Sequence, residues 1–127
     1  MNLVAIPSFR PDKRPFQLGN IIPFLSQKIC RWRHGRKYPH VLHYPDHKEV
    51  AYYSLTPDIR LESLKKDFDF CRSQGGSFIL ATHYWEFDAH QSYDPSIRMR
   101  DVFYEFWEYV VKKDNVNFTT INKVFNN

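Results

Sequence analysis

The 127-residue chain has few of the residues that mark several large classes of protein. It contains two cysteines, too few for a disulfide-stabilised scaffold, and four glycines, none of which lies in a glycine-rich phosphate-binding loop. Its longest apolar runs, residues 21–25 and 77–81, are far shorter than the ~20 residues that cross a bilayer. These shortages exclude a small disulfide-rich protein, a P-loop nucleotide-binding protein and a transmembrane helix.

Two motifs of metal and nucleophile chemistry are also missing, a Cys-x-x-Cys pair and a Gly-x-Ser-x-Gly turn. Cys30 follows Ile29, and Cys71 lies in an apolar stripe with helical spacing, so both are predicted to be small buried side chains. Residues 1–6 carry no basic segment and meet Pro7 before an apolar stretch of ~7 to 15 residues can form. We therefore expect no signal peptide and a cytoplasmic protein.

The chain does have enough apolar material for one core. Hydrophobic residues make up 43% of it and aromatic residues 17%. A chain of this length buries roughly two thirds of the surface that it exposes when unfolded. No linker, internal repeat or low-complexity tract divides it, so we expect a single domain over residues 1–127.

Hydrophobic periodicity predicts alternating strands and helices. Short apolar runs predict strands at residues 3–6, 49–55, 77–82 and 116–119. Apolar residues that recur every three or four positions predict helices at residues 21–32, 61–71, 95–111 and 121–125. This order implies an α/β fold of repeated βα units with a mostly parallel sheet of about four strands. The run at 77–82 is apolar throughout, which is typical of a central strand buried on both faces.

Five residues predict where helices begin or end. Asn20, Asp94 and Thr120 are placed to cap helix N-termini, and Pro95 follows Asp94 within a first turn. Gly35 stands where a left-handed glycine commonly ends a helix.

Residues 82–88 directly follow the predicted central strand and form the strongest candidate for a functional site. In parallel α/β folds, ligands gather beyond the carboxyl ends of the strands. His83 can exchange a proton near neutral pH, and Trp85 can shield it from water. Either Glu86 or Asp88 can fix its tautomer. The alternative is a structural histidine that bonds a loop carbonyl.

Three further residues are candidates for binding charged groups or metal. Arg10 follows the first predicted strand and can clamp a carboxylate or phosphate, although a solvated loop charge would look the same. His43 and His47 are weak candidates for a zinc site, because three residues separate them. Pro45 lies between the two histidines and would break a helix that aligned them.

The formal net charge of +4 is concentrated in one basic run, residues 28–37. Its five cations are Lys28, Arg31, Arg33, Arg36 and Lys37. Such a run can neutralise phosphates, and it is also typical of a helix C-terminus, where positive charge complements the helix dipole. The second interpretation is favoured, so nucleic acid is not the expected partner.

Four segments occur in the order and spacing of a known family. They are residues 6–11 with a Phe-Arg-Pro motif, residues 75–83 with a strand ending in histidine, residues 83–88 close to a His-Pro-Trp-Glu-x-Asp variant, and the apolar residues 116–121. In these segments the chain resembles the C-terminal half of a polysaccharide deacetylase catalytic domain. The resemblance spans nearly the whole chain and about the later half of that family's distorted (β/α) barrel.

The resemblance implies a hydrolase that removes acetyl groups from N-acetylated sugars, with zinc or a similar divalent metal activating water. It makes His83 the general acid that protonates the leaving amine, and it places Arg10 beside the catalytic aspartate. It makes Trp85 a wall of the acetyl pocket. Glu86 and Asp88 match the variant motif and join Trp85 as expected substrate-binding residues.

The chain departs from the family pattern at the metal. The family's metal ligands and base come from Thr-Phe-Asp-Asp and His-x3-His segments that precede the arginine motif, and this chain has neither there. We therefore expect a deacetylase-like partial barrel that hydrolyses the sugar amide when a metal-binding half completes it. Its open sheet edge predicts a homodimer or a complementing chain. The alternative is a non-catalytic basic module that binds nucleic acid or an anionic glycan.

Overall fold

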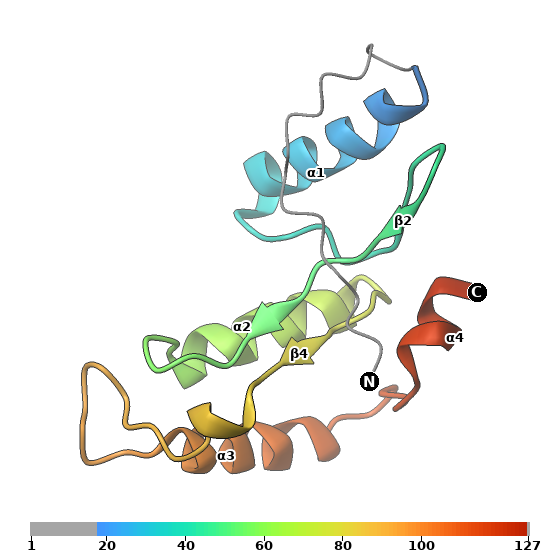
Figure 1. The fold of residues 1–127 in the computed structure, drawn as a ribbon. Helices are drawn as coiled ribbons and strands as arrows, with labels where there is room; N and C mark the ends of the chain where they lie inside the picture. Colours follow the sequence, from blue (N-terminus) through green and yellow to red (C-terminus); the bar gives the residue numbers. More distant parts are fainter. Residues whose placement is uncertain (1–17, 127) are drawn as a thin grey trace.

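The computed structural model describes residues 18–126, so the predicted strand at 3–6 and Arg10 lie outside the described residues (Figure 1). The helices are α1 (Ile21–His34), α2 (Leu61–Ser73), α3 (Met99–Val111) and α4 (Ile121–Asn126), with 3-10 turns η1 (Leu18–Asn20) and η2 (Tyr84–Glu86). The strands are β1 (Leu42–His43), β2 (Lys48–Glu49), β3 (Tyr53–Ser54) and β4 (Leu80–Ala81).

The core lies between α2 and α3, with β3 and β4 beside them. Its buried members are Tyr53, Leu55, Leu64, Phe68, Cys71, Met99, Val102, Phe106 and Val110. Phe68 is the aromatic centre, because its ring lies edge-on to Phe78, Phe106 and Tyr109 at 5.5, 5.8 and 6.3 Å. Burying a side chain of this size contributes roughly 1.5–3 kcal/mol, so this cluster is the main source of stability.

The strands form two separate pairs. β1 and β2 are antiparallel, with Leu42 opposite Glu49, whereas β3 and β4 are parallel, with Tyr53 opposite Leu80. The α2 helix connects the two parallel strands, so this segment is one βαβ unit. Between β2 and β3 the chain changes partners within three residues, which limits the length of both strands.

The prediction of a mostly parallel α/β sheet, half of a distorted barrel, is wrong for the described residues. They hold only two sheets of two short strands each, one of them antiparallel, and the helices dominate. The predicted central strand at 77–82 is reduced to β4 and is half-buried rather than buried on both faces. Within residues 18–126 the predicted strand at 116–119 has no strand partner, and Phe118 packs against Trp107 of α3 at 5.1 Å.

The helices themselves were predicted well, and two of the four predicted caps are confirmed. The α1, α2, α3 and α4 helices all lie where the periodicity places them. Gly35 does end α1 with φ 65°, and its amide donates to the Arg31 carbonyl at 2.9 Å. At the start of α4, the Thr120 hydroxyl oxygen accepts a bond from the Lys123 amide at 3.4 Å. Asn20 makes no capping bond, and α3 begins after Arg98 rather than after Asp94, whose carboxylate instead accepts a bond from the Ser96 amide. Local turn formation outcompeted helix capping there.

The α1 helix lies apart from the core helices and is held at its C-terminal end (Figure 1). Only Pro23 and Cys30 of α1 are buried. The connection to α2 runs through the ion pair between Arg36 and Asp67, whose nitrogen and oxygen lie 2.5 Å apart. Gly76 allows the loop after α1 to come close, because a Cβ there would collide with the Pro39 carbonyl oxygen.

Candidate functional site

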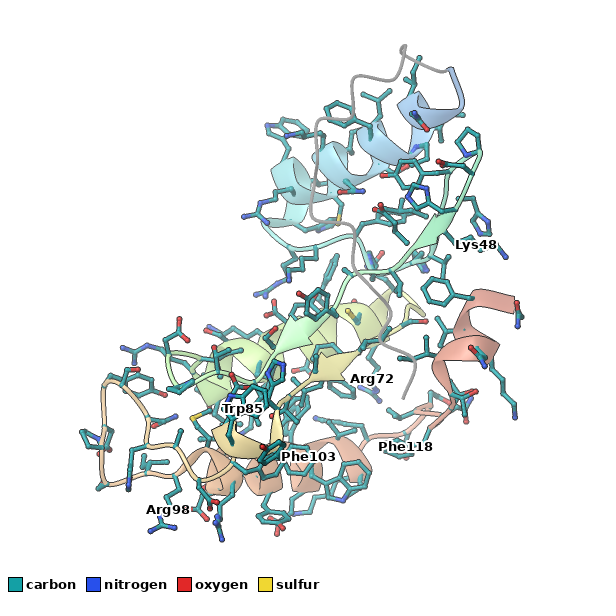
Figure 2. The ribbon with its side chains drawn as sticks, in the orientation of Figure 1. Lys48, Arg72, Trp85, Arg98, Phe103 and Phe118 are labelled. Atoms are coloured by element: carbon teal, nitrogen blue, oxygen red, sulfur yellow. The ribbon has the colours of Figure 1, made fainter. Side chains whose placement is uncertain are left out.

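The η2 turn, which follows β4 after two residues, positions the candidate site. His83 precedes the turn in an extended conformation, with φ −105° and ψ 145°. The rings of His83 and Trp85 stack with centroids 4.3 Å apart and planes 16° apart, and Tyr84 meets Trp85 edge-on at 5.1 Å. Trp85, on the turn beside α3, is 58% exposed, so this aromatic group faces solvent (Figure 2).

Glu86 is the carboxylate that contacts His83. Its Oε2 accepts a bond from the His83 backbone N–H at 3.2 Å and lies 3.4 Å from the imidazole Nδ1. The Glu86 side chain is only 17% exposed, whereas that of His83 is 60% exposed. A carboxylate at Nδ1 favours the tautomer with hydrogen on that nitrogen, and Nε2 has no partner among residues 18–126.

Asp88 belongs to a different contact. Its carboxylate pairs with the Arg100 guanidinium of α3, and the Arg100 amide donates to the Phe87 carbonyl at 3.0 Å. These bonds fasten the end of the site loop to the first turn of α3. In this arrangement Asp88 holds the loop, while Glu86 contacts the imidazole.

The weak zinc candidates lie elsewhere, on the β1–β2 hairpin. His43 is exposed on β1, and both ring nitrogens of His47 contact carboxylate oxygens, Asp46 Oδ1 at 2.7 Å and Glu49 Oε1 at 2.8 Å. The hydrogen bond to Glu49 is the main reason that the pKa of His47 is raised, with Asp46 adding to it. His47 is thus engaged in an ion-pair cluster on the hairpin.

The residues that the structure describes do not supply the ligands of a catalytic metal. No three His, Cys, Asp or Glu side chains within residues 18–126 are grouped so that they could hold an ion.

A groove beside the site was not predicted from the sequence. It has a volume of about 510 Å³ and extends from Thr82, next to His83, along α3 to the start of α4. Phe103, Trp107 and Phe118 line it together with Arg72, and Figure 2 labels three of these four. The periodicity placed Trp107 in a core stripe, but its side chain is 45% exposed.

The basic run divides between two environments. Arg36 pairs with Asp67, and the Lys37 ammonium donates to the Tyr52 carbonyl at 2.7 Å, so both link the loop after α1 to other segments of the described chain. Partial burial lowers the pKa of Lys37. Lys28, Arg31 and Arg33 are exposed on α1.

No family model, curated protein or solved structure matches this chain. The resemblance to polysaccharide deacetylases therefore stays a prediction that rests on the motifs alone. Residues 18–126 include no helix that is both long and apolar enough to cross a membrane.

Proposed function

We propose that the chain acts on N-acetylated carbohydrate as a deacetylase-like protein, in which His83 is the proton donor. The single observation that carries the proposal is the local geometry of His83. Its Nδ1 lies beside Glu86, its ring stacks on Trp85, and the side chain stays open to solvent. Nε2 stays free of partners among the described residues, so the doubly protonated ring, with its Nδ1–H beside Glu86, can give its Nε2 proton to a leaving amine and become the neutral Nδ1–H tautomer.

The aromatic surroundings support a sugar as the ligand. Trp85 offers an exposed ring face next to the imidazole, and the groove lined by Phe103 and Trp107 starts one residue before His83. Aromatic faces provide large apolar contact area with little loss of conformational entropy. The metal and the base of a deacetylase would come from residues outside 18–126 or from a partner chain.

The proposal is tested first by binding. The full chain, labelled for NMR, is titrated with N-acetylglucosamine oligomers and separately with the same oligomers after chemical deacetylation. We expect the His83 imidazole and Trp85 indole signals to move with the acetylated oligomers and much less with the deacetylated ones. If neither signal responds to either sugar, the proposal is wrong.

A second measurement tests the proton-donor role. Acetate release from the oligomers is followed with zinc or cobalt present, and any activity is compared among variants. We expect His83→Ala to lower the rate by about 10²- to 10⁴-fold, the usual contribution of a general acid. His90→Ala, which removes an exposed histidine from the loop before α3, should leave the rate unchanged. Equal rates for the two variants would remove His83 from the mechanism.

A further inference from the structure

The α1 helix displays an apolar stripe to solvent. Ile22, Leu25, Ile29 and Trp32 follow one another at intervals of three, four and three residues and are 75, 47, 55 and 87% exposed. At 3.6 residues per turn these side chains lie on one narrow face of the helix. Pro23 and Cys30, the buried residues of α1, lie on the opposite face. Ile29 also borders a shallow pocket with Tyr38 and Phe70, but more than half of its surface stays open to solvent, like that of Ile22 and Trp32.

Cations flank this stripe. On a helical projection Arg33 lies on one side of it, and Lys28 lies on the other with Arg31 beyond. No Asp or Glu occurs from Leu18 to Pro45, and α1 itself carries three cations and no anion. Within residues 18–126, Arg31 and Arg33 make no ion pair. An anionic surface would therefore meet this face without repulsion.

We propose that α1 binds the surface of membranes that contain anionic phospholipid. A helix with aliphatic and Trp side chains between flanking Lys and Arg is typical of segments that lie in the membrane interface. The stripe would enter the interface, and Lys28 and Arg33, one on each side of it, would contact the headgroups. The proposal is independent of His83 and goes beyond the proposed function.

The apolar stripe is what favours lipid over nucleic acid. Three exposed cations suit either anion, but Ile22, Leu25 and Ile29 have no polar group to offer a phosphate or a base edge. In an interface those same side chains leave water. Figure 1 shows α1 at one end of the molecule, where only its C-terminal end approaches α2, so a flat bilayer could reach it.

The test is sedimentation of the full chain with vesicles of equal parts phosphatidylcholine and phosphatidylserine, and with vesicles of phosphatidylcholine alone. We expect binding to the anionic vesicles, with a loss of roughly fivefold in affinity for each cation removed. The double variant Lys28→Glu, Arg33→Glu should then bind at least about 25-fold more weakly. The double variant Ile29→Ser, Trp32→Ser should lose binding to a similar extent.

Two matched controls separate the α1 face from general charge and apolarity. Lys66→Glu with Lys112→Glu reverses two exposed cations on and after the core helices, and Tyr104→Ser with Val111→Ser removes two exposed apolar side chains of α3. Both controls should bind vesicles as the unaltered chain does. Circular dichroism and size exclusion confirm that all variants fold alike.

Three results would overturn the proposal. One is no sedimentation with anionic vesicles. Another is binding that survives the Ile29→Ser, Trp32→Ser change and is competed by a double-stranded oligonucleotide or heparin, which would assign the face to a nucleic acid or an anionic glycan. The third is a dimer in solution that this variant dissolves while vesicle binding is absent, which would assign the face to a second copy of the chain.

Discussion

The α1 and α3 helices are nearly equal in length and carry the same kind of apolar stripe, yet they meet different surroundings. The α3 helix buries Met99, Val102, Phe106 and Val110 against α2 and the strand pair. The α1 helix buries only Pro23 and Cys30 and leaves its stripe in solvent. Periodicity therefore identifies an apolar face, but what covers that face depends on the rest of the fold.

The largest expected difference between the core and α1 is in the free energy of unfolding after one side chain is shortened in each. Leu64 is fully buried between α2 and α3, so Leu64→Ala should lower the free energy of unfolding by about 3 kcal/mol. Ile29 is 55% exposed on α1, so Ile29→Ala should change it by less than about 0.5 kcal/mol. Urea unfolding followed by circular dichroism measures both. Similar losses for the two variants would mean that the α1 stripe is covered in the folded chain.

The two cysteines allow a second comparison of the same two regions, because one lies on α1 and the other lies in the core. Cys30 on α1 and Cys71 in the core are both buried, and burial raises the pKa of each thiol. Both must therefore be exposed by local opening before they react. Because α1 buries so few side chains, Cys30 should be modified at least about tenfold faster, a difference of ~1.4 kcal/mol in opening free energy.

Mass spectrometry of the native protein after timed exposure to a thiol reagent measures the two rates. The Leu64→Ala variant supplies the control, because it weakens the contacts around Cys71 and leaves α1 intact. It should raise the rate at Cys71 and leave that at Cys30 nearly unchanged. A faster reaction at Cys71 in the unaltered chain would contradict the ranking of the two regions.

The sequence predicted the helices because their signals are local. Leu61, Leu64, Phe68 and Cys71 repeat at helical spacing, and this spacing holds whatever lies nearby. Strands depend on a distant partner that no local pattern identifies. The residues at 77–82 were expected to lie within a broad sheet, but among residues 18–126 the β3 strand is their one strand partner. Phe118, expected in the last strand, packs on α3.

In the candidate site, too, the contacts between residues close in sequence were predictable, and those with distant segments were not. His83, Trp85 and Glu86 lie within four residues, so one turn brings them together. The sequence could not choose between Glu86 and Asp88, since the partner of Asp88, Arg100, comes from the next helix. The groove was missed for the same reason, because its aromatic lining combines α3 with the segment before α4.

The smallest expected effect is the pH dependence of stability that comes from the β1–β2 hairpin, which contacts α1. The β1–β2 hairpin is tied to α1 by a bond from Gln27 to the Tyr44 hydroxyl, and the Tyr44 ring stacks on His47 at 4.7 Å. Hydrogen bonding to Glu49 raises the pKa of His47 above its unfolded value of about 6.5. The fold therefore favours the protonated ring. Its contribution is fully present below about pH 6.5 and is lost as pH rises through the folded pKa.

Because the His47 side chain is 40% exposed, solvent screening limits this contribution to about 0.5 kcal/mol. Urea unfolding at about pH 6 and about pH 8 should therefore show slightly greater stability at the lower pH, as far as this group is concerned. His47→Gln should remove that part of the difference, and His90→Gln, which alters a histidine outside the hairpin, should preserve it. If replacing His47 instead made the stability differ more between the two pH values, the contacts of His47 with Asp46 and Glu49 would not favour its protonated ring.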